Sequence, residues 1–283
     1  MEQNFSISDI NISVVSEDGL QVSEKWQKFL SPAFFPKMSY RICHREPLPP
    51  LPDCWEYADS RVRCGNGGKL RQYLDNHGEP YCTVAEREKD AWDIFPREEQ
   101  RWGREVAHYF ENFDLTHALL PFGVLLLHCA YVLTDRGAIL FTAPSGTGKT
   151  TQAELWEKHR GARIVNGDRA ALRCKENVAM VYGLPFSGSS ACCENVTAPI
   201  LAVVGLSQGK ENCIRRLQGS SAVREILQGV YCLPEHRGEL PQMFDCAIEM
   251  AKRVPVYHLA CLPELSAVEC LEAELKKLVL PNV

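Results

Sequence analysis

The chain has no pair of cysteines at C-x-x-C spacing, although it contains 13 cysteines among 283 residues. This absence argues against a zinc ribbon and against a thioredoxin-like redox site, because both need closely paired thiols. The first residues, Met1-Glu2-Gln3-Asn4, are polar and acidic and do not resemble a secretory signal peptide. We therefore expect a cytoplasmic protein whose cysteines are reduced.

The chain also lacks an excess of positive charge. Its formal net charge is −5 at pH 7, and its pI is near 5.9, which argues against a general nucleic-acid partner. The stretch from Leu115 to Thr134 has no charged residue and approaches the roughly 20 apolar residues that a membrane span needs. It contains Pro121 and two histidines, however, so we expect a soluble chain with no membrane partner.

Length and composition are those of a globular protein with one large domain or two smaller ones. We predict a mixed α/β fold. Residues 1–113 are expected to form a β-rich N-terminal region, because glycine-containing turns at 65–68 and 76–78 separate short strand-like runs. Residues 114–283 are expected to form a nucleotide-binding domain.

Periodicity predicts several elements around the centre of the chain. A pairing of the strands Ile200–Leu206 and Cys213–Leu217 is also expected. Helices are predicted at Glu98–Asn112, Leu115–Leu127 and Thr151–His159, and strands at His128–Leu133, Ala138–Thr142 and Ala162–Val165.

The most informative motif is a phosphate-binding loop between the predicted strand 138–142 and the predicted helix 151–159. The motif reads Ala143-Pro144-Ser145-Gly146-Thr147-Gly148-Lys149-Thr150, followed by Thr151. Gly146 and Gly148 allow the backbone N–H groups to approach phosphate oxygens closely at a helix N-terminus. Lys149 supplies a positive charge for the outer phosphates, and Thr150 supplies a hydroxyl for Mg²⁺. Ala143 replaces the first glycine of the usual pattern.

Two further residues are candidates for chemistry beside this loop. Asp168 follows the strand Ala162–Val165, which is expected to neighbour the loop strand, so we predict that its carboxylate serves as a metal ligand or base. The alternative is a turn aspartate within Asn166-Gly167-Asp168. His128, at the start of a strand, is from sequence alone more typical of a satisfied core residue.

At these residues the chain resembles the HPr kinase/phosphorylase family and its phosphoenolpyruvate carboxykinase-like relatives. The likeness is closest to the HPr-kinase-like proteins of bacterial peptide-modification clusters. In that family a strand that opens with His leads through a hairpin into the phosphate loop, as His128 does here, and an acidic pair follows the next strand. Gly167 occupies the first position of that pair, and Pro144 stands where the family commonly has Asp. The matching segments are His128–Leu133, Ala138–Phe141, 166–169, 182–190 and 254–259.

The resemblance implies an HPr-kinase-like core that transfers a phosphoryl group from ATP or another phosphate donor, with Mg²⁺, to a serine-type hydroxyl of a peptide, protein or small molecule. It assigns catalysis to His128, Lys149 and Asp168 and metal binding to Thr150 and Asp168. Whether the chain forms a homo-oligomer is left open. Two alternatives are a nucleotide-binding scaffold or switch without phosphotransfer, which the missing acid at Gly167 favours, and an ATP-dependent carboxykinase, whose further ligands have no visible counterpart.

Overall fold

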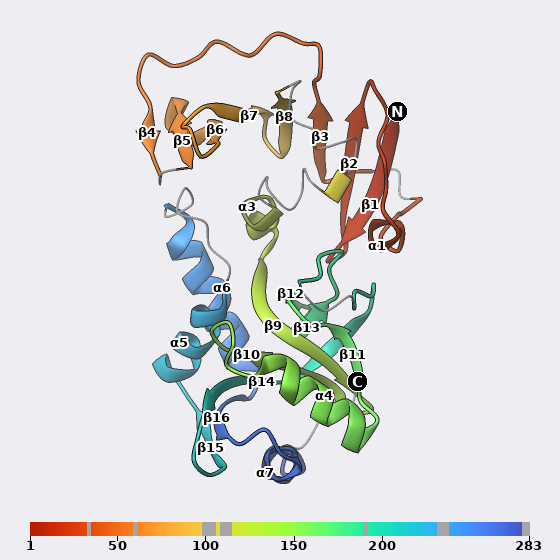
Figure 1. Cartoon of the computed structure of the whole chain (residues 1–283), viewed down its shortest axis with the longest axis vertical. Coiled ribbons are helices and arrows are strands. Elements are labelled where there is room, and N and C mark those ends of the chain that lie inside the picture. The colour runs from red at the N-terminus through yellow and green to blue at the C-terminus, as the bar shows by residue number, and fades with distance from the viewer. Residues whose placement is uncertain are drawn as a thin grey trace. The chain divides into compact units, whose positions relative to one another are not determined.

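A computed structural model describes most of the chain (Figure 1). The described residues are 1–32, 35–58, 61–97, 106–107, 115–188, 192–230 and 238–278. They divide into two compact units, Met1–Leu119 with Cys232–Leu240, and Leu120–Tyr231 with Pro241–Val283. The predicted boundary between residues 113 and 114 lies outside the described residues. So does the predicted helix Glu98–Asn112, except for residues 106–107, which are helical.

The first unit is built on an eight-stranded mixed sheet with the strand order β1-β2-β3-β8-β7-β6-β5-β4. The predicted run of strands and hairpin turns is confirmed at β5, β6 and β7. Strands β1, β3, β4 and β8 were not predicted. The strands are β1 Glu2–Ile7, β2 Ile10–Ser16, β3 Met38–Ile42, β4 Glu56–Tyr57, β5 Val62–Gly65, β6 Leu70–Leu74, β7 Pro80–Glu88 and β8 Ala91–Pro96, and the helices are α1 Glu24–Gln27, η1 Asn66–Gly68 and α3 Leu115–Leu119.

The second unit contains another eight-stranded mixed sheet, flanked by helices. The chain is therefore mixed α/β with two large mixed sheets. The strands are β9 Val124–Thr134, β10 Gly137–Thr142, β11 Arg163–Asn166, β12 Arg169–Lys175, β13 Val178–Tyr182, β14 Thr197–Gln208, β15 Cys213–Leu217 and β16 Val256–Cys261, and the helices are η2 Leu120–Phe122, α4 Lys149–Arg160, α5 Ser220–Gly229, α6 Leu240–Arg253 and α7 Leu265–Leu275.

Two strand pairings differ from the prediction. The strand after α4, β11, pairs with β9, whereas the loop strand β10 pairs with β9 and β14. Strand β15 pairs with β16, and β14 lies on the other side of β16. Strands β10 and β11, and likewise β14 and β15, are consecutive in the chain but not adjacent in the sheet, because the long strands β9 and β14 each pair with several partners.

The predicted helix Leu115–Leu127 is also wrong beyond its first turns. Residues Leu115–Leu119 are helical, but Val124–Thr134 form strand β9, whose first residues pair with β12. Residues Val124 to Leu127 are all buried. A strand covered on both faces has no polar alternation, so its continuous apolar run cannot be distinguished from a buried helix by period.

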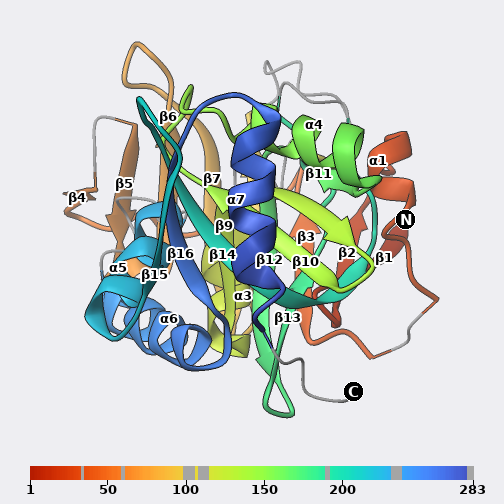
Figure 2. The same cartoon turned by 90° about the horizontal axis from the view of Figure 1, so that it is seen from below.

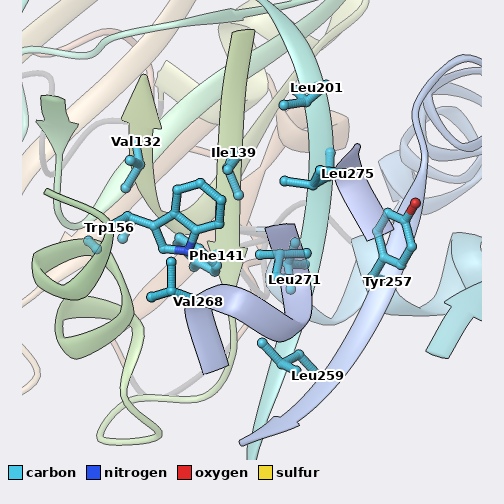
Figure 3. Close-up of a cluster of buried hydrophobic side chains, with 14 of the residues drawn as sticks. Val132, Ile139, Phe141, Trp156, Leu201, Tyr257, Leu259, Val268, Leu271 and Leu275 are labelled. Atoms are coloured by element: carbon cyan, nitrogen blue, oxygen red, sulfur yellow. The ribbon is translucent and has the colours of Figure 1, made fainter. Parts of the chain in front are cut away.

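Helices cover both faces of the second sheet (Figure 2). On one face, Trp156 of α4 and Val268 of α7 pack against Phe141 of β10 in a buried cluster (Figure 3). On the other face, a Cβ atom at Gly205 of β14 would meet the Glu225 carboxylate of α5. Because successive strand residues point to opposite faces, β10 and β14 are held from both sides. This packing fixes the end of β10, where the phosphate loop begins.

None of the helices in the described ranges is both long and apolar enough to cross a membrane.

Candidate functional site

The phosphate loop connects the buried end of β10 to the first turn of α4. Gly146 and Gly148 have φ values of 78° and 116°, a region that side-chain-bearing residues rarely occupy. Gly148 is the N-cap of α4, and no side chain of the described residues caps this helix. The first backbone N–H groups of α4 therefore remain available to an anion, and the helix dipole favours negative charge at this end.

Lys149 lies within the loop instead of extending into solvent. Only 7% of its surface is exposed, and its Nζ donates hydrogen bonds to the carbonyl oxygens of Ala143 at 2.8 Å and Pro144 at 3.3 Å. Burial lowers the pKa of Lys149, while the nearby Cys129 and Asp168 act in the opposite direction. A phosphate group at the loop would offer this ammonium a stronger acceptor than two neutral carbonyls.

Asp168 and His128 lie next to each other beside this lysine. The Nε2 atom of His128 is 4.0 Å from Oδ1 of Asp168. The backbone explains this proximity, because Arg169 of β12 is the register partner of His128 of β9, and the Cys129 N–H donates to the Asp168 carbonyl oxygen at 3.0 Å. The structure thus brings His128, Lys149 and Asp168 together, and the tertiary arrangement rather than the sequence spacing does so.

The pKa of His128 lies below its usual value of 6.5. Burial is the main cause, the Lys149 charge adds to it, and the Asp168 carboxylate opposes it. A lowered pKa keeps the imidazole neutral at physiological pH, and a neutral imidazole can accept a proton from a hydroxyl.

Asn166 holds the turn that carries Asp168. Its side chain is fully buried, and its Oδ1 accepts hydrogen bonds from the N–H groups of Asp168 at 2.9 Å and Arg169 at 3.1 Å. Its Nδ2 donates to the carbonyl oxygens of Leu184 at 3.1 Å and Phe186 at 2.6 Å. One side chain therefore ties the turn at 166–169 to the segment after β13.

That segment places Gly188 against the carboxylate. A Cβ atom at position 188 would lie 2.8 Å from Oδ1 of Asp168, so any side chain there would crowd the carboxylate. The other oxygen, Oδ2, accepts a hydrogen bond from Nε of Arg169 at 2.7 Å. The Arg169 guanidinium lies 5.2 Å above the Phe186 ring. The carboxylate is therefore oriented from two sides.

The donor set near the loop fits Mg²⁺. The Thr150 hydroxyl and the Asp168 carboxylate are hard oxygen ligands, and Mg²⁺ in nucleotide sites is usually held by one or two such groups together with phosphate oxygens. Thr150 is exposed at the start of α4, where a phosphate-bound ion would have access to it. No group of three or more His, Cys, Asp or Glu side chains in the described ranges could hold a metal alone.

Sequence reasoning placed the loop residues and named His128 and Asp168, but it missed three contributors. Gly188 and Asn166 lie in the segments 182–190 and 166–169 that carry the family resemblance, but neither was given a role of its own. Gln152, buried in the first turns of α4, was not singled out. Its polar side chain between Lys149 and Ala153, on the inward face of the helix, is the signal that could have found it.

Comparison with known proteins finds one distant structural similarity and no match in sequence. No protein-family model matches the chain, and no curated protein matches it. Among solved structures, the chain resembles the Hpr(Ser) kinase/phosphatase from Coxiella burnetii with a TM-score of 0.33 and 11% sequence identity. That match covers 53% of this chain and 92% of the other.

Proposed function

We propose that the chain is a nucleotide-dependent kinase that transfers a phosphoryl group, with Mg²⁺, to a serine-type hydroxyl of a peptide, protein or small molecule. The observation that carries the proposal is the convergence of His128 and Asp168 on the buried Lys149 of the loop. Binding of a phosphate group at the loop requires only the glycines and the lysine. An acid and a neutral imidazole beside it supply the proton acceptor that transfer to a hydroxyl requires.

In the proposed reaction the acceptor oxygen forms a bond to the γ-phosphorus, and the bond between that phosphorus and the β,γ-bridging oxygen breaks. The nucleoside diphosphate leaves with the electron pair. The hydroxyl proton passes to the Asp168 carboxylate or to Nε2 of His128, which lie 4.0 Å apart. Lys149 and the N-terminal amides of α4 stabilise the charge on the transferring phosphoryl group. Bound Mg²⁺, held by Thr150 and Asp168, would neutralise the β- and γ-oxygens.

A non-catalytic nucleotide binder is the second candidate, and one contact favours it. Arg169 donates to Oδ2 of Asp168 at 2.7 Å, so one of the two carboxylate oxygens is already engaged in a hydrogen bond and is not free to take a proton from an acceptor. In this alternative the chain is a scaffold or switch: the loop binds a nucleotide, and no phosphate bond is cleaved.

Incubation with γ-labelled ATP, Mg²⁺ and candidate hydroxyl acceptors separates the two functions. The kinase proposal predicts a labelled acceptor, loss of labelling in Lys149→Ala, and retention of nucleotide binding without labelling in Asp168→Asn. Lys158→Ala, an exposed lysine in the last turn of α4 and away from the loop, is the matched control and should label normally. Nucleotide binding with no transfer to any acceptor, and no effect of Asp168→Asn, would favour the non-catalytic binder.

A further inference from the structure

A serine, a histidine and a glutamate form a continuous chain of hydrogen bonds on the second sheet. The Oγ atom of Ser207 in β14 is 3.0 Å from Nε2 of His258 in β16. Nδ1 of the same histidine is 2.9 Å from Oε1 of Glu225 in α5. A hydroxyl within hydrogen-bond reach of a base, with the base oriented by a third group, is the arrangement that activates a serine as a nucleophile.

The fold brings these three side chains together from three elements. His258 is the register partner of Gly205, and Ser207 lies two residues after Gly205, so the serine and the histidine lie on the same face of the sheet. A Cβ atom at Gly205 would meet the Glu225 carboxylate. The glycine therefore leaves the space through which this carboxylate reaches the histidine.

The hydrogen bonds give each nitrogen of His258 a different role. An ionised carboxylate only accepts, so Nδ1 carries the proton that is donated to Glu225, and Nε2 of the neutral ring accepts from the Ser207 hydroxyl. The side chains of His258 and Glu225 are 31% and 16% exposed, and Ser207 is half-buried. A small substrate in solvent can therefore reach the serine oxygen.

This group of side chains is separate from the candidate kinase site. Leu206 belongs to the buried cluster formed with α4 and α7, so Ser207, the next residue of the strand, faces the side where α5 lies. Gln208 and Gly209 line the cavity beside the phosphate loop, whereas Ser207 does not. The proposed kinase thus gives no role to the hydrogen-bonded serine.

The same strand offers a backbone donor next to this serine. The last pair that β10 makes with β14 is Thr142 with Gly205. The Gly209 N–H donates to the Cys261 carbonyl oxygen of β16 at 3.1 Å, and backbone groups of successive strand residues point to opposite sides. The Gln208 N–H therefore points to the side where β10 has ended. An N–H directly after the nucleophile is a type of donor that stabilises the oxyanion of acyl transfer.

We propose that Ser207, His258 and Glu225 form a second catalytic site, which hydrolyses carboxylic esters through an acyl-serine intermediate. The Ser207 oxygen forms a bond to the acyl carbon, and its proton passes to Nε2 of His258. The bond from that carbon to the ester oxygen breaks, and the leaving alcohol takes the proton from Nε2. Water then attacks the acyl-serine by the same steps and releases the carboxylic acid. Glu225 is a positioning residue, which orients the ring and stabilises its positive charge.

The first test uses a fluorophosphonate probe, which forms a stable adduct with an activated serine and releases fluoride. We expect an adduct on Ser207, located by peptide mass spectrometry, and labelling at least about 100-fold slower in His258→Gln. Ser221→Ala is the matched control, because this exposed α5 serine bonds to the backbone of Gln218, and it should label at the native rate. Absence of an adduct on Ser207, or native labelling of His258→Gln, would overturn the proposal.

The second test examines Glu225 with the isosteric Glu225→Gln, whose circular dichroism spectrum should match that of the native chain. With p-nitrophenyl acetate as substrate, and the rate of Ser207→Ala subtracted as background, kcat should fall at least about tenfold and KM should stay within about twofold. A purely structural glutamate would leave kcat unchanged, and that result would contradict the three-residue arrangement. Neither assay contains a nucleotide, so its outcome is independent of the proposed kinase.

Discussion

At the scale of single residues, Asn166 connects the turn that carries Asp168 to the segment after β13. Its buried carboxamide bonds to four backbone groups from two segments, and the two bonds to the Leu184 and Phe186 carbonyl oxygens are fully buried. Removing the side chain would take one hydrogen-bond partner from each of these groups, and of the four the Leu184 carbonyl oxygen would still accept from Cys193 Sγ at 3.1 Å. Buried polar groups in this situation destabilise a fold more than the loss of an exposed hydrogen bond does.

Asn166→Ala is therefore expected to lower the free energy of unfolding by about 2–4 kcal/mol. Urea denaturation followed by circular dichroism measures this change. Lys210→Ala, on the exposed surface, is the control and should change stability by less than about 0.5 kcal/mol. Equal stability of Asn166→Ala and the native chain would mean that solvent or other groups replace these four bonds.

The lowered pKa of His128 predicts how turnover depends on pH. A histidine whose pKa lies below 6.5 stays neutral to lower pH than an ordinary imidazole, so turnover should persist at pH 6.5 and fall only in more acidic solution. His128→Gln should reduce kcat by about 100-fold and remove this acidic limb, with little change in ATP affinity. The pH–rate profiles of both proteins check this, and an acidic limb that survives in His128→Gln would assign it to another group.

At the scale of elements, the sequence predicted the loop and its flanking strand and helix well. β10 matches the expected strand 138–142 closely, and α4 begins within the motif and ends at Arg160. These elements are set by local signals, namely glycines with positive φ and an apolar strand before a helix. In β9 the predicted strand His128–Leu133 is confirmed, but residues 124–127 were predicted as helix, because both faces of this strand are covered and burial depends on strands far away in the sequence.

Gly188 offers a test at this scale, because the segment after β13 fits against Asp168 only if residue 188 has no side chain. In Gly188→Ala the new Cβ would lie 2.8 Å from Oδ1 of Asp168, so the carboxylate or the segment must shift. We expect kcat to fall at least about tenfold while ATP affinity changes little, since misplacement of a reacting group by about 1 Å can cost 100-fold. Gly238→Ala, where a Cβ has no neighbour within 4 Å, is the matched control, and equal kinetics in both variants would contradict a role of Gly188 in orienting Asp168.

At the scale of the whole molecule, the second unit is organised by a ring of strand pairings. β10 pairs with β9, β9 with β12, β12 with β13, β13 with β14, and β14 with β10. The ring places His128 of β9, the loop after β10 and the turn before β12 at one place. The sequence analysis named these residues as candidates, yet it expected β11 beside β10. Non-local pairing of this kind is not encoded in any local period, which limits what the sequence alone predicts.

The measurement that tests the central claim most directly is Mg²⁺-dependent release of γ-phosphate from ATP in the absence of an acceptor, with water in its place. The proposed kinase predicts slow release by the native chain that requires Mg²⁺. That release should be lost in Lys149→Ala and in Asp168→Asn, although Asp168→Asn still binds ATP. Release that continues in Asp168→Asn at the native rate, or ATP that is bound but never cleaved with or without acceptors, would contradict the proposed phosphoryl transfer.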